Sequence, residues 1–455
     1  MINIKIDSRK IEPGDTFVAI PGATVDGHDF IGKAIEAGAT KVVVEKDVKC
    51  SVEKLLVDNT NDWLTRHIEE KYSSTINEMN IIGITGTNGK TTTAYLTYQM
   101  LNKLGSKTAY IGTIGFYLPN ENFIELPNTT PNILDLYELL LTAKENGCKN
   151  VIMEVSSHAL HQERVKGIKY KVAGFTNLTQ DHLDYHETMD KYLAAKQLIL
   201  KQLTGPMIVN IDDSCGSKWM SAYNNSKDLG KNANSYSIIS YEDSHNGTII
   251  KFKVEEVDYE VETNLRSTFN VYNYLTALAF CNNLGYEVEE IINVTSSIYP
   301  PKGRCEQIKV KDGEAVIDYA HTPDAVEKII NAFSETKKGR VITIIGCGGD
   351  RDPKKRPIMG RIAAEKSDYV VFTSDNPRTE DPQAIMNDIL AGVSTSNYEV
   401  VLDRREAIKK ALDMINKDDV VLILGKGHED YQIIGHDKIH LDDAEEVRKY
   451  VEKHK

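Results

Sequence analysis

Apolar residues fall along the chain in short continuous runs, and between these runs they recur at every third or fourth position. Continuous runs predict buried strands, whereas the wider spacing predicts helices with one apolar face. In the central part of the chain the two patterns alternate, which is typical of a mostly parallel sheet covered by helices. The predicted strands are 80–84, 108–111, 151–155, 172–175 and 207–210, and the predicted helices are 91–104, 134–146 and 192–203.

The same patterns divide the chain into three predicted domains, residues 1–78, 79–299 and 300–455. We expect an α/β fold, with a central P-loop ATPase-type parallel sheet and a C-terminal Rossmann-like domain. The first domain has predicted strands at 16–20, 41–44 and 54–57, a helix at 30–37 and a polar linker at 69–80. The second ends in antiparallel strands within 236–261 and a helix at 271–283, and the third has strands at 315–318, 341–345, 369–373 and 420–424.

A glycine-rich loop joins the predicted strand at 80–84 to the next helix and reads Thr85-Gly86-Thr87-Asn88-Gly89-Lys90-Thr91-Thr92. The pattern G-x-x-x-x-G-K-[ST] is not fully met, because its first glycine position falls on Ile84. Gly86 and Gly89 still let backbone N–H groups curl around phosphate oxygens, while Lys90 supplies a charge and Thr91 a hydroxyl for Mg²⁺. A strand, such a turn and a helix N-terminus together predict an ATP or GTP site. The alternative is a tight turn without a ligand.

Two further strand ends of this sheet carry polar clusters. Glu154 ends the strand at 151–155, where ligands bind in open parallel sheets, so it can serve a Mg²⁺ held by the phosphate loop; otherwise it simply faces water. Asp181-His182-Leu183-Asp184-Tyr185-His186 is a polar capping loop or a metal site, and zinc is disfavoured because nucleotide chemistry calls for Mg²⁺. Downstream, Lys196 sits among apolar residues of a helix, and its spacing alone favours a lysine that reaches solvent.

Four loops of the third domain follow predicted strands. They contain Asp318 to Asp324, Gly346 to Asp352, Ser374 to Arg378 and Gly425 to Glu429. Charged or glycine-rich loops at one edge of a parallel sheet predict a binding crevice. The segment Gly346-Cys347-Gly348-Gly349 lacks the full G-x-G-x-x-G pattern, so NAD binding is not expected.

Composition narrows the class of protein. The 455 residues carry a net charge of −13 and a pI near 5.5, which argues against binding of nucleic acid. No apolar run approaches the ~18 residues that span a membrane, and the first residues show no signal-peptide pattern. The six cysteines are scattered without a C-x-x-C pair, as expected of reduced thiols in a cytoplasmic protein without membrane association.

These motifs resemble the Mur ligase family over essentially the whole chain. Beyond the stretches above, the resemblance rests on Asp7-Ser8-Arg9, Asn128-Thr129-Thr130-Pro131, Ala195-Lys196 and Asp375-Asn376-Pro377-Arg378. The family's own loop reads T-G-T-N-G-K-T, so the departure from the general pattern is expected of it. The resemblance implies a UDP-binding N-terminal domain, a central ATPase and a C-terminal domain that closes over the site.

The resemblance also implies a reaction that uses ATP and Mg²⁺ in peptidoglycan precursor synthesis. The γ-carboxylate of D-Glu in UDP-MurNAc-L-Ala-D-Glu attacks the γ-phosphate of ATP. An amino group of the incoming amino acid then attacks the acyl phosphate, giving an amide, ADP and phosphate. Lys90, Mg²⁺ and the loop N–H groups would offset the repulsion between the two anions. The partners are small molecules, and the chain is expected to act as a monomer.

Residue roles follow from the resemblance. It assigns catalysis to Lys90, His182 and Lys196, and metal ligation to Thr91, Glu154, His182 and a carbamate (from CO₂) on Lys196, which would be an anionic ligand for a second Mg²⁺. It assigns ATP binding to Gly86, Thr87, Asn88, Gly89, Lys90, Thr91, Thr92, Asn270, Asn273, Arg304 and Asp318. It assigns the UDP-muropeptide to Ser8, Asn128, Thr129, Thr130, Ser156, Gln162 and Arg164.

Amino-acid selection is assigned to the third domain, where the stretch from Asp375 to Arg378 resembles that of members that add meso-diaminopimelate. Arg378 would clamp the distal carboxylate of that substrate, and Glu429 would pair with its distal ammonium. L-Lysine has no distal carboxylate and would leave Arg378 unpaired, whereas meso-lanthionine would satisfy both residues equally. The remaining residues of this predicted site are Arg351, Asp375, Asn376, Pro377 and Gly425.

Other interpretations of the sequence remain open at this point. Arg378 can be a surface arginine in a turn. A related ligase that adds glutamate to a folate is a second enzyme hypothesis, which the Asn-Thr-Thr-Pro and Asp-Asn-Pro-Arg stretches disfavour. A nucleotide-gated binding protein is a third, and Glu154, His182 and Lys196 argue against it because a switch needs no second metal.

Overall fold

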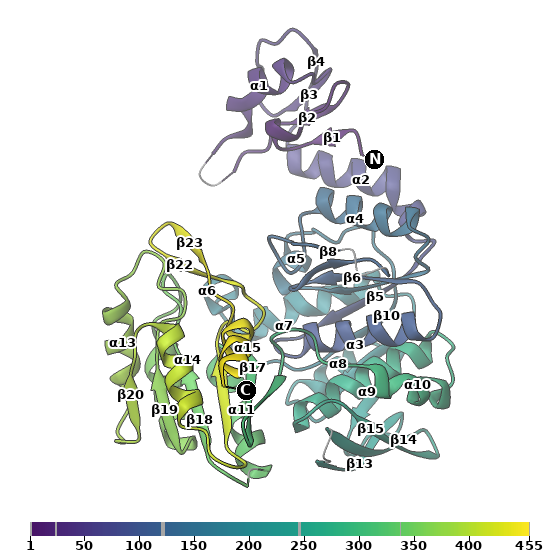
Figure 1. Ribbon diagram of the computed structural model, residues 1–455. Coiled ribbons are helices and arrows are strands. Elements are labelled where there is room, and N and C mark those ends of the chain that lie inside the picture. Colours follow the sequence, from purple (N-terminus) through teal and green to yellow (C-terminus); the bar gives the residue numbers. More distant parts are fainter. Residues whose placement is uncertain (1, 23–24, 120–122, 244–246, 337, 455) are drawn as a thin grey trace. The chain divides into compact units, whose positions relative to one another are not determined.

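The computed structural model describes residues 2–22, 25–119, 123–243, 247–336 and 338–454, and their elements are labelled in Figure 1. The chain forms two compact units. Unit 1 comprises Met1–Thr85, Gly105–Ala173 and Ala194–Pro206, and unit 2 comprises Gly86–Leu104, Gly174–Leu193 and Met207–Lys455. Among the described residues, no helix is both long enough and apolar enough to cross a membrane.

Unit 1 begins with a four-stranded parallel sheet in the order β1-β2-β3-β4. Its strands are β1 (Ile4–Lys5), β2 (Thr16–Val18), β3 (Lys41–Val44) and β4 (Glu53–Leu56), and its helices are η1 (Ser8–Lys10), η2 (Gly27–Phe30) and α1 (Ile31–Glu36). Phe17, Val42 and Val44 pack with Ile31 and Ala34 of α1 in one buried core. The predicted strands and helix of this region are thereby confirmed.

The predicted linker at 69–80 is wrong, because most of it belongs to a long helix, α2 (Thr60–Ile76). Asn59 caps this helix by accepting a hydrogen bond from the N–H of Asp62. Leu64, Ile68 and Ile76 are buried at helical spacing, and α2 packs on α4 (Ile133–Glu145). The polar residues that suggested a linker lie on the opposite, exposed face of an amphipathic helix.

Unit 1 also holds five strands of an eleven-stranded sheet, in the order β5-β9-β6-β7-β8. They are β5 (Asn80–Thr85), β9 (Asn150–Glu154), β6 (Thr108–Gly112), β7 (Gly115–Tyr117) and β8 (Phe123–Ile124). β9 pairs in parallel with both β5 and β6, as the alternating pattern predicted. The remaining elements of unit 1 include α5 (Ser157–His161), the end of α7 (Met189–Gln197) and η3 (Leu198–Gln202). The helix predicted at 192–203 thus changes to 3₁₀ geometry after Gln197.

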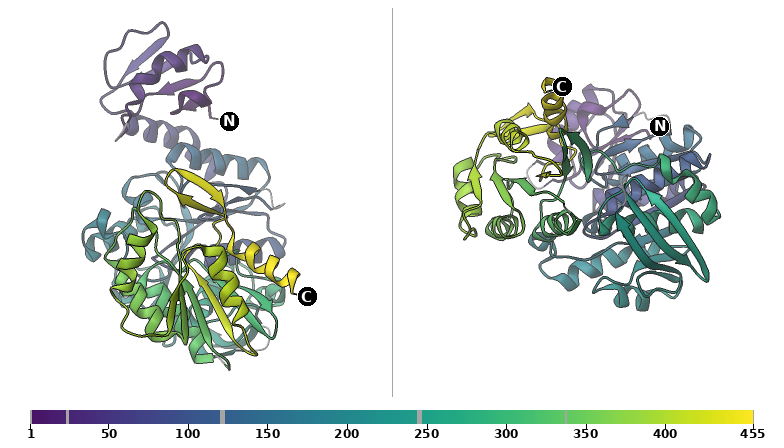
Figure 2. Two further views of the ribbon diagram at one scale, coloured as in Figure 1. Left: turned by 60° about the vertical axis from the view of Figure 1, so that its left-hand side comes forward. Right: turned by 60° about the horizontal axis from the view of Figure 1, so that its bottom comes forward.

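The chain passes from unit 1 into unit 2 within β10 (Tyr170–Phe175). Unit 2 contributes five further strands in the order β11-β12-β13-β14-β15, of which the last three are antiparallel, as predicted for 236–261. Residues 244–246 of that prediction lie outside the described part of the chain. The strands are β11 (Met207–Asn210), β12 (Ser226–Gly230), β13 (Tyr236–Asp243), β14 (Thr248–Val254) and β15 (Val257–Thr263). The helices α3 (Lys90–Lys103) and α9 (Thr268–Asn283) pack together, and α9 also packs on β13 (Figure 2).

The rest of unit 2 is built on a six-stranded sheet in the order β16-β17-β21-β18-β19-β20, parallel except for β16. Alternate residues of each strand face opposite sides: Val316 and Leu422 pack with α11, α12 and α13, whereas Ile317 and Ile423 pack with α14 and α15. The strands are β16 (Glu306–Val310), β17 (Gly313–Asp318), β18 (Val341–Ile345), β19 (Tyr369–Phe372), β20 (Tyr398–Val400) and β21 (Val420–Leu424). The helices are α11 (Pro323–Thr336), α12 (Lys355–Lys366), α13 (Pro382–Leu390), α14 (Arg404–Asp413) and α15 (Asp443–Lys453).

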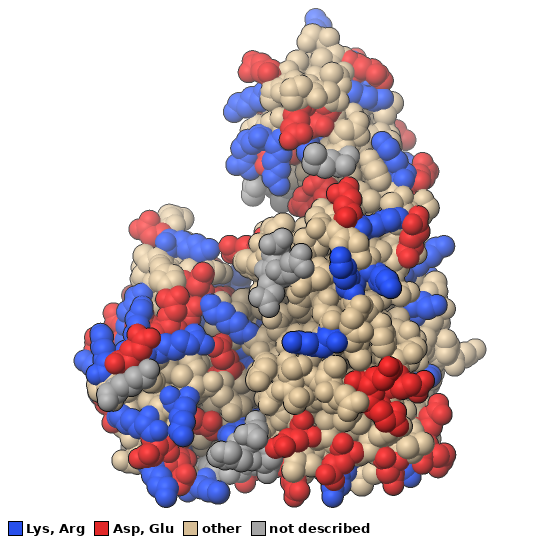
Figure 3. Space-filling view, turned by 45° about the vertical axis from the view of Figure 1, so that its right-hand side comes forward, with Lys and Arg blue, Asp and Glu red and all other residues tan. Residues whose placement is uncertain are grey.

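Smaller elements complete unit 2. They are α6 (Leu183–His186), α8 (Gly216–Ala222), α10 (Val288–Val294), η4 (Thr295–Ser297) and the antiparallel hairpin β22 (Tyr431–Ile434) with β23 (Asp437–His440). On the face drawn in Figure 3, acidic and basic side chains lie interspersed, and no broad basic patch stands out there.

Candidate active site

The glycine-rich loop after β5 is held by residues that follow β10, all within unit 2. Thr176 Oγ1 and Asn177 Nδ2 donate to the carbonyl of Asn88 at 2.7 and 3.0 Å, and the N–H of Asn88 donates to Asn177 Oδ1 at 2.9 Å. A Cβ on Gly86 would lie 1.9 Å from Thr176 Oγ1, so no side chain fits there. The loop is therefore a rigid backbone cradle, as an anion-binding loop requires.

Gly89 caps the N-terminus of α3 with a φ of 86°, in the left-handed region that favours glycine. A Cβ there would lie 2.4 Å from Asn273 Oδ1, because Asn273 of α9 packs directly over the loop. Asn273 is oriented by Asn270, whose Oδ1 accepts from its Nδ2 at 2.9 Å. The two asparagines predicted at the nucleotide site thus lie beside the loop. Lys90 Nζ donates to the carbonyls of Gly86 and Thr87 at 3.0 and 2.8 Å.

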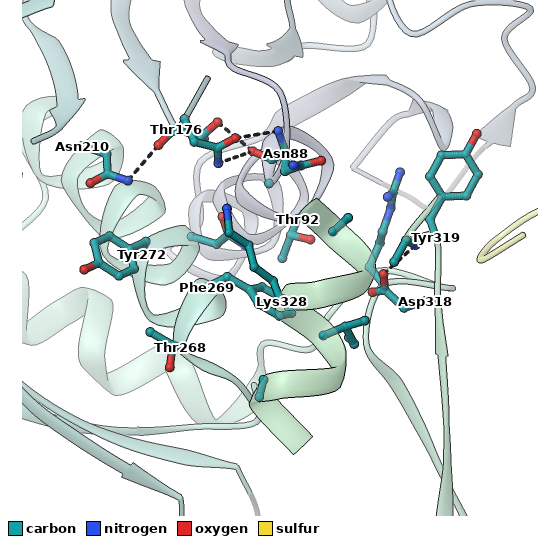
Figure 4. A pocket seen from close by; sticks show the side chains of 18 of the residues that line it. Asn88, Thr92, Thr176, Asn210, Thr268, Phe269, Tyr272, Asp318, Tyr319 and Lys328 are labelled. Atoms are coloured by element: carbon teal, nitrogen blue, oxygen red, sulfur yellow. Dashed lines mark hydrogen bonds between the residues drawn. The ribbon is translucent and has the colours of Figure 1, made fainter. Parts of the chain in front are cut away.

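A cavity of about 420 Å³ opens beside this loop within unit 2 (Figure 4). Six of the residues predicted to bind ATP line it: Asn88, Gly89, Thr92, Asn273, Arg304 and Asp318. Its wall also includes residues that were given no individual role from the sequence, among them Asn177, Asp212, Phe269, Tyr272, Tyr319 and Lys328. Phe269 and Tyr272 supply apolar faces suited to a flat ring. A signal for Tyr272 was available, since it lies within the helix predicted at 271–283.

Arg304 and Asp318 lie together on the wall contributed by the start of the six-stranded sheet. The guanidinium of Arg304 stacks on the ring of Tyr319, with its carbon 4.4 Å from the ring centroid, and its Nη2 donates to Thr91 Oγ1 at 3.4 Å. Arg304 Nε is buried and donates to no group among the described residues. Asp318 accepts from the N–H groups of Cys305 and Ala320, and burial raises the pKa of its carboxyl.

In unit 1, Glu154 ends β9 with a fully buried side chain. Its Oε1 accepts from Tyr110 Oη at 2.6 Å and from the Thr113 N–H at 3.0 Å, and its Oε2 accepts from Thr113 Oγ1 at 3.2 Å. The alternative in which this glutamate simply faces water is therefore wrong. Three donors hold its carboxylate in one orientation at the carboxyl end of the strand.

Most residues predicted for the UDP-muropeptide gather next to Glu154 in unit 1. Thr130 Oγ1 donates to the Glu154 carbonyl at 2.9 Å and accepts from the Ser156 N–H at 3.1 Å, while Arg164 Nη1 donates to the Thr130 carbonyl at 3.1 Å. Arg164 is further held by Gln162 Oε1. Thr129 shares a hydrogen bond with Thr113, and Asn128 is exposed beside it. Ser8 lies in η1, on the four-stranded sheet.

The structure corrects the interpretation of Lys196. Its spacing favoured a lysine that reaches solvent, but its side chain is 1 % exposed within unit 1. His182, in unit 2, has a 47 % exposed side chain, and its Nε2 lies 3.4 Å from Asp181 Oδ2. His182 has a φ of 54° and begins α6. Among the described residues, no three His, Cys, Asp or Glu side chains form a group able to hold a metal ion.

Three loops at the carboxyl ends of β18, β19 and β21 meet in unit 2, as predicted. The Gly349 N–H donates to the Asn376 carbonyl at 2.9 Å, and Arg378 Nη1 donates to the Gly349 carbonyl at 2.7 Å. Asn376 Nδ2 donates to Glu429 Oε2 at 2.8 Å. Gly425 lies against Asp375, since a Cβ there would be 2.6 Å from Asp375 Oδ2. Pro377 is buried between them and Arg351 is exposed at the rim.

Sequence reasoning missed one charged residue of this cluster. Lys426 is fully buried and donates to Glu429 Oε2 at 3.1 Å. Burial raises the pKa of Glu429, while Lys426 opposes that rise and Asp375 adds to it. The lysine was visible in Gly425-Lys426-Gly427-His428-Glu429, but nothing in that spacing indicated that its side chain turns inward.

Models of known families match three stretches of the chain. Residues 2–73 match the model described as Mur ligase family, catalytic domain; residues 84–281 match the Mur ligase middle domain; and residues 303–427 match the Mur ligase, glutamate ligase domain. The chain is also 41 % identical over 464 residues to UDP-N-acetylmuramoyl-L-alanyl-D-glutamate–2,6-diaminopimelate ligase 1 of Clostridium acetobutylicum. That alignment covers 99 % of this chain and 94 % of the relative.

Solved structures of Mur ligases also resemble this chain. A UDP-N-acetylmuramoyl-L-alanyl-D-glutamate–2,6-diaminopimelate ligase superposes with a TM-score of 0.68 and 30 % identity, covering 100 % of this chain and 95 % of that one. The MurF ligase of Thermotoga maritima in complex with ADP superposes with a TM-score of 0.72 over 99 % of this chain and 97 % of that one. At 21 % identity, the second likeness speaks for the fold alone.

Proposed function

The chain belongs to the Mur ligase family, and from that premise we propose that it joins meso-2,6-diaminopimelate to UDP-N-acetylmuramoyl-L-alanyl-D-glutamate at the expense of ATP, in peptidoglycan precursor synthesis. The observation that carries this proposal is the meeting of Arg378, Asn376 and Glu429 at the carboxyl ends of β18, β19 and β21. One cation and one anion on a shared rim match an amino acid with a distal carboxylate and a distal ammonium.

The first step forms an acyl phosphate. An oxygen of the D-Glu γ-carboxylate attacks the γ-phosphorus of ATP, the bond to the β-phosphate oxygen breaks, and ADP leaves. Lys90 and the N–H groups of the loop from Gly86 to Gly89 oppose the charge that collects on the phosphoryl oxygens. Arg304, which is stacked on Tyr319 and donates to Thr91 Oγ1, adds a second cation beside the loop.

The second step forms the amide. The free amine of diaminopimelate attacks the acyl carbon, the bond to the phosphate oxygen breaks, and inorganic phosphate leaves with loss of a proton from nitrogen. Arg378 clamps the distal carboxylate and Glu429 pairs with the distal ammonium, so that the other end of the amino acid reaches the acyl phosphate. The predicted contacts of Thr129, Thr130, Ser156, Gln162 and Arg164 hold the muropeptide; Ser8 and Asn128 complete that set.

Mg²⁺ would be held by Thr91, Glu154 and His182. The donor set fits, because Mg²⁺ takes few protein ligands and completes its shell with phosphate oxygens and water. The Thr91 hydroxyl and the Glu154 carboxylate are hard oxygen donors of the kind that Mg²⁺ prefers, whereas His182 offers a nitrogen and is included because of the family resemblance. When bound, the metal supplies positive charge to the β- and γ-phosphates.

A carbamate on Lys196 belongs to the same proposal. The side chain of Lys196 is 1 % exposed, and a carbamate would turn this buried ammonium into an anion suited to a second Mg²⁺. Incubation with ¹³C-labelled CO₂ should give a carbamate ¹³C signal that is lost in Lys196→Met. A signal that persists in the variant would contradict this assignment.

The organisation proposed with this function is a UDP-binding domain at 1–78, a central domain at 79–299 and an amino-acid domain at 300–455. The matched stretches 2–73, 84–281 and 303–427 fall within these bounds and support them. We further propose a monomeric enzyme that acts in the cytoplasm, where ATP and nucleotide-linked precursors are found.

The test of the function is amide formation with UDP-N-acetylmuramoyl-L-alanyl-D-glutamate, ATP and Mg²⁺, comparing meso-diaminopimelate with L-lysine. We expect a strong preference for meso-diaminopimelate. Arg378→Ala should reduce kcat/KM for it by about 10²-fold, since a charged hydrogen-bonded pair is lost, while the KM for ATP stays unchanged. Preference for L-lysine would contradict the role of Arg378, and no amide with either amino acid would contradict the proposed function.

A further inference from the structure

Lys426 is a buried ammonium whose hydrogen bonds are all taken by the protein. It follows Gly425 at the end of β21 and has no exposed surface. Its Nζ donates to Glu429 Oε2 at 3.1 Å, to Asn376 Oδ1 at 3.4 Å and to the carbonyl of Tyr431. An ammonium has three N–H donors, so this set uses all of them. Lys426 therefore has no donor left for a ligand.

The side chains of Lys426, Asn376 and Glu429 form a closed ring of three hydrogen bonds. Asn376 Nδ2 donates to Glu429 Oε2 at 2.8 Å, and Lys426 donates to both of the other two members. Asn376 is fixed in turn, because its Oδ1 also accepts from the N–H of Ile433 at 2.9 Å. Each member of the ring is thus oriented by the other two.

The two oxygens of Glu429 are treated differently by this ring. Both hydrogen bonds fall on Oε2, whereas Oε1 accepts none within the described part of the chain. The side chain of Glu429 keeps 14 % of its surface exposed, although that of Lys426 keeps none. One oxygen is anchored to the protein, and the other accepts no hydrogen bond from the described residues.

We propose that Lys426 is a positioning residue for amino-acid selection, which holds Glu429 ionised and directs its Oε1 toward the distal ammonium of the substrate. This inference rests on the proposed function. Burial disfavours the ionised form of Glu429, and the neighbouring Asp375 disfavours it further, so an adjacent cation is needed to keep the carboxylate charged. A protonated Glu429 would attract a substrate ammonium far less strongly.

The test compares two substrates that differ only at the group in question. L-2-Aminopimelate keeps the reacting amine and both carboxylates of meso-diaminopimelate but lacks the distal ammonium. For the full-length enzyme, the ratio of kcat/KM for meso-diaminopimelate to that for L-2-aminopimelate measures recognition of that ammonium. Lys426→Met should lower this ratio by about 10- to 100-fold, the usual effect of losing a charged hydrogen bond, mainly through the KM for meso-diaminopimelate.

Lys311→Met is the matched control. Lys311 lies in the same domain, donates to the carbonyl of Leu412 at 3.1 Å and lies over the ring of Tyr450, but it is remote from the three loops in sequence and in contacts. It should leave the substrate ratio and the KM for ATP unchanged. An equal fall of kcat/KM for both substrates in Lys426→Met would show a merely structural role and overturn the proposal, as would an unchanged ratio.

Lys426→Met leaves Glu429 buried without its cation, and this variant can therefore fail to fold. A second comparison keeps the proposal testable in that case. The double variant Lys426→Met with Glu429→Gln contains no buried unpaired charge, and it is compared with Glu429→Gln, in which Lys426 keeps its hydrogen bonds to Asn376 and the Tyr431 carbonyl. If Lys426 acts through Glu429, the two should show the same substrate ratio. A lower ratio in the double variant would overturn the proposal. Absence of amide formation by the unaltered chain would instead overturn the proposed function, and this inference with it.

Discussion

Arg404 and Asp443 form a salt bridge in which neither side chain has any exposed surface. Two hydrogen bonds, of 2.8 and 2.7 Å, join the guanidinium to the carboxylate. Arg404 Nη2 also donates to the carbonyl of Leu424 at 3.0 Å, the residue directly before Gly425. The pair thus ties the core of the six-stranded sheet to a loop of the proposed amino-acid site.

Removing the arginine should destabilise the protein strongly. Arg404→Ala leaves the Asp443 carboxylate buried without a partner, which costs about 3–5 kcal/mol. We expect a marked fall in the free energy of unfolding, measured by urea denaturation. Arg448→Ala is the control, because Arg448 pairs with Glu306 at an exposed position and should change stability by at most ~1 kcal/mol. Equal effects of the two substitutions would contradict this account.

Gly89 should be required for nucleotide binding because of space as well as backbone conformation. Gly89→Ala places a Cβ 2.4 Å from Asn273 Oδ1 at a φ of 86°. Gly105→Ala has a similar φ of 80° but meets no atom within 4 Å, so it isolates the backbone effect of about 1–2 kcal/mol. We expect Gly89→Ala to raise the KM for ATP at least about tenfold.

The Gly105→Ala control should lose some thermal stability and keep the KM for ATP of the unaltered enzyme. A normal KM in Gly89→Ala would show that the loop and Asn273 can move apart, against the packing described above.

Acidification should weaken binding of the amino acid. Burial raises the pKa of Glu429, with Lys426 opposing and Asp375 adding to the rise, so its carboxylate becomes protonated at a pH above the ordinary glutamate value of about 4.3. The KM for meso-diaminopimelate should therefore rise as the pH is lowered toward that raised pKa. Steady-state kinetics of Glu429→Gln, which cannot ionise, should show a flat profile; an equally steep profile would exclude Glu429 as the titrating group.

His428 should make stability depend on pH below the ordinary histidine range. Burial, followed by the charges of Arg304, Lys302 and Lys426, lowers the pKa of His428 to about 3. Between that value and the ~6.5 of an unfolded histidine, only the unfolded chain binds the proton. The free energy of unfolding should then fall with decreasing pH across this window, by up to ~1.4 kcal/mol per pH unit.

The check is the loss of melting temperature between pH 7.5 and 5.5 in His428→Asn and in His436→Asn, whose histidine is exposed. The first variant should lose less than the unaltered protein, and the second should behave like it. A larger loss in His428→Asn would reverse the sign and contradict the assignment.

The sequence predicts most of this fold because each strand of the parallel sheets is a continuous apolar run. The predicted strand at 420–424, for instance, is β21, buried on both faces. The linker at 69–80 failed for the opposite reason: the buried side of α2 consists of a few residues, such as Leu64 and Ile68, in a polar background. Because so few residues of α2 are apolar, the average composition of the segment is polar and conceals the helical spacing of the buried ones.

The candidate site likewise has one part that is visible in the sequence and another part that is not. The glycine-rich loop is visible because its function requires adjacent residues in a fixed spacing. Buried Lys196 and Lys426 are not visible in this way, because whether a lysine is buried depends on how the rest of the chain packs around it. Lys426 and Asn376 lie 50 positions apart in the sequence, and only the fold brings them together.

The hairpin of β22 and β23 holds the loop from Ser374 to Arg378 in place. Gln432 donates to the carbonyl of Asp375, and the N–H of Arg378 donates to the carbonyl of Ile433 at 3.0 Å, so the loop is joined to the hairpin by a single parallel bridge between Arg378 and Ile434. We expect a loop held in this way to keep a fixed position, so that amino acids one methylene longer or shorter than meso-diaminopimelate are added more slowly. Transferring the loop alone into a relative would remove the two hydrogen bonds that hold it in place. The hairpin would therefore have to be transferred with the loop.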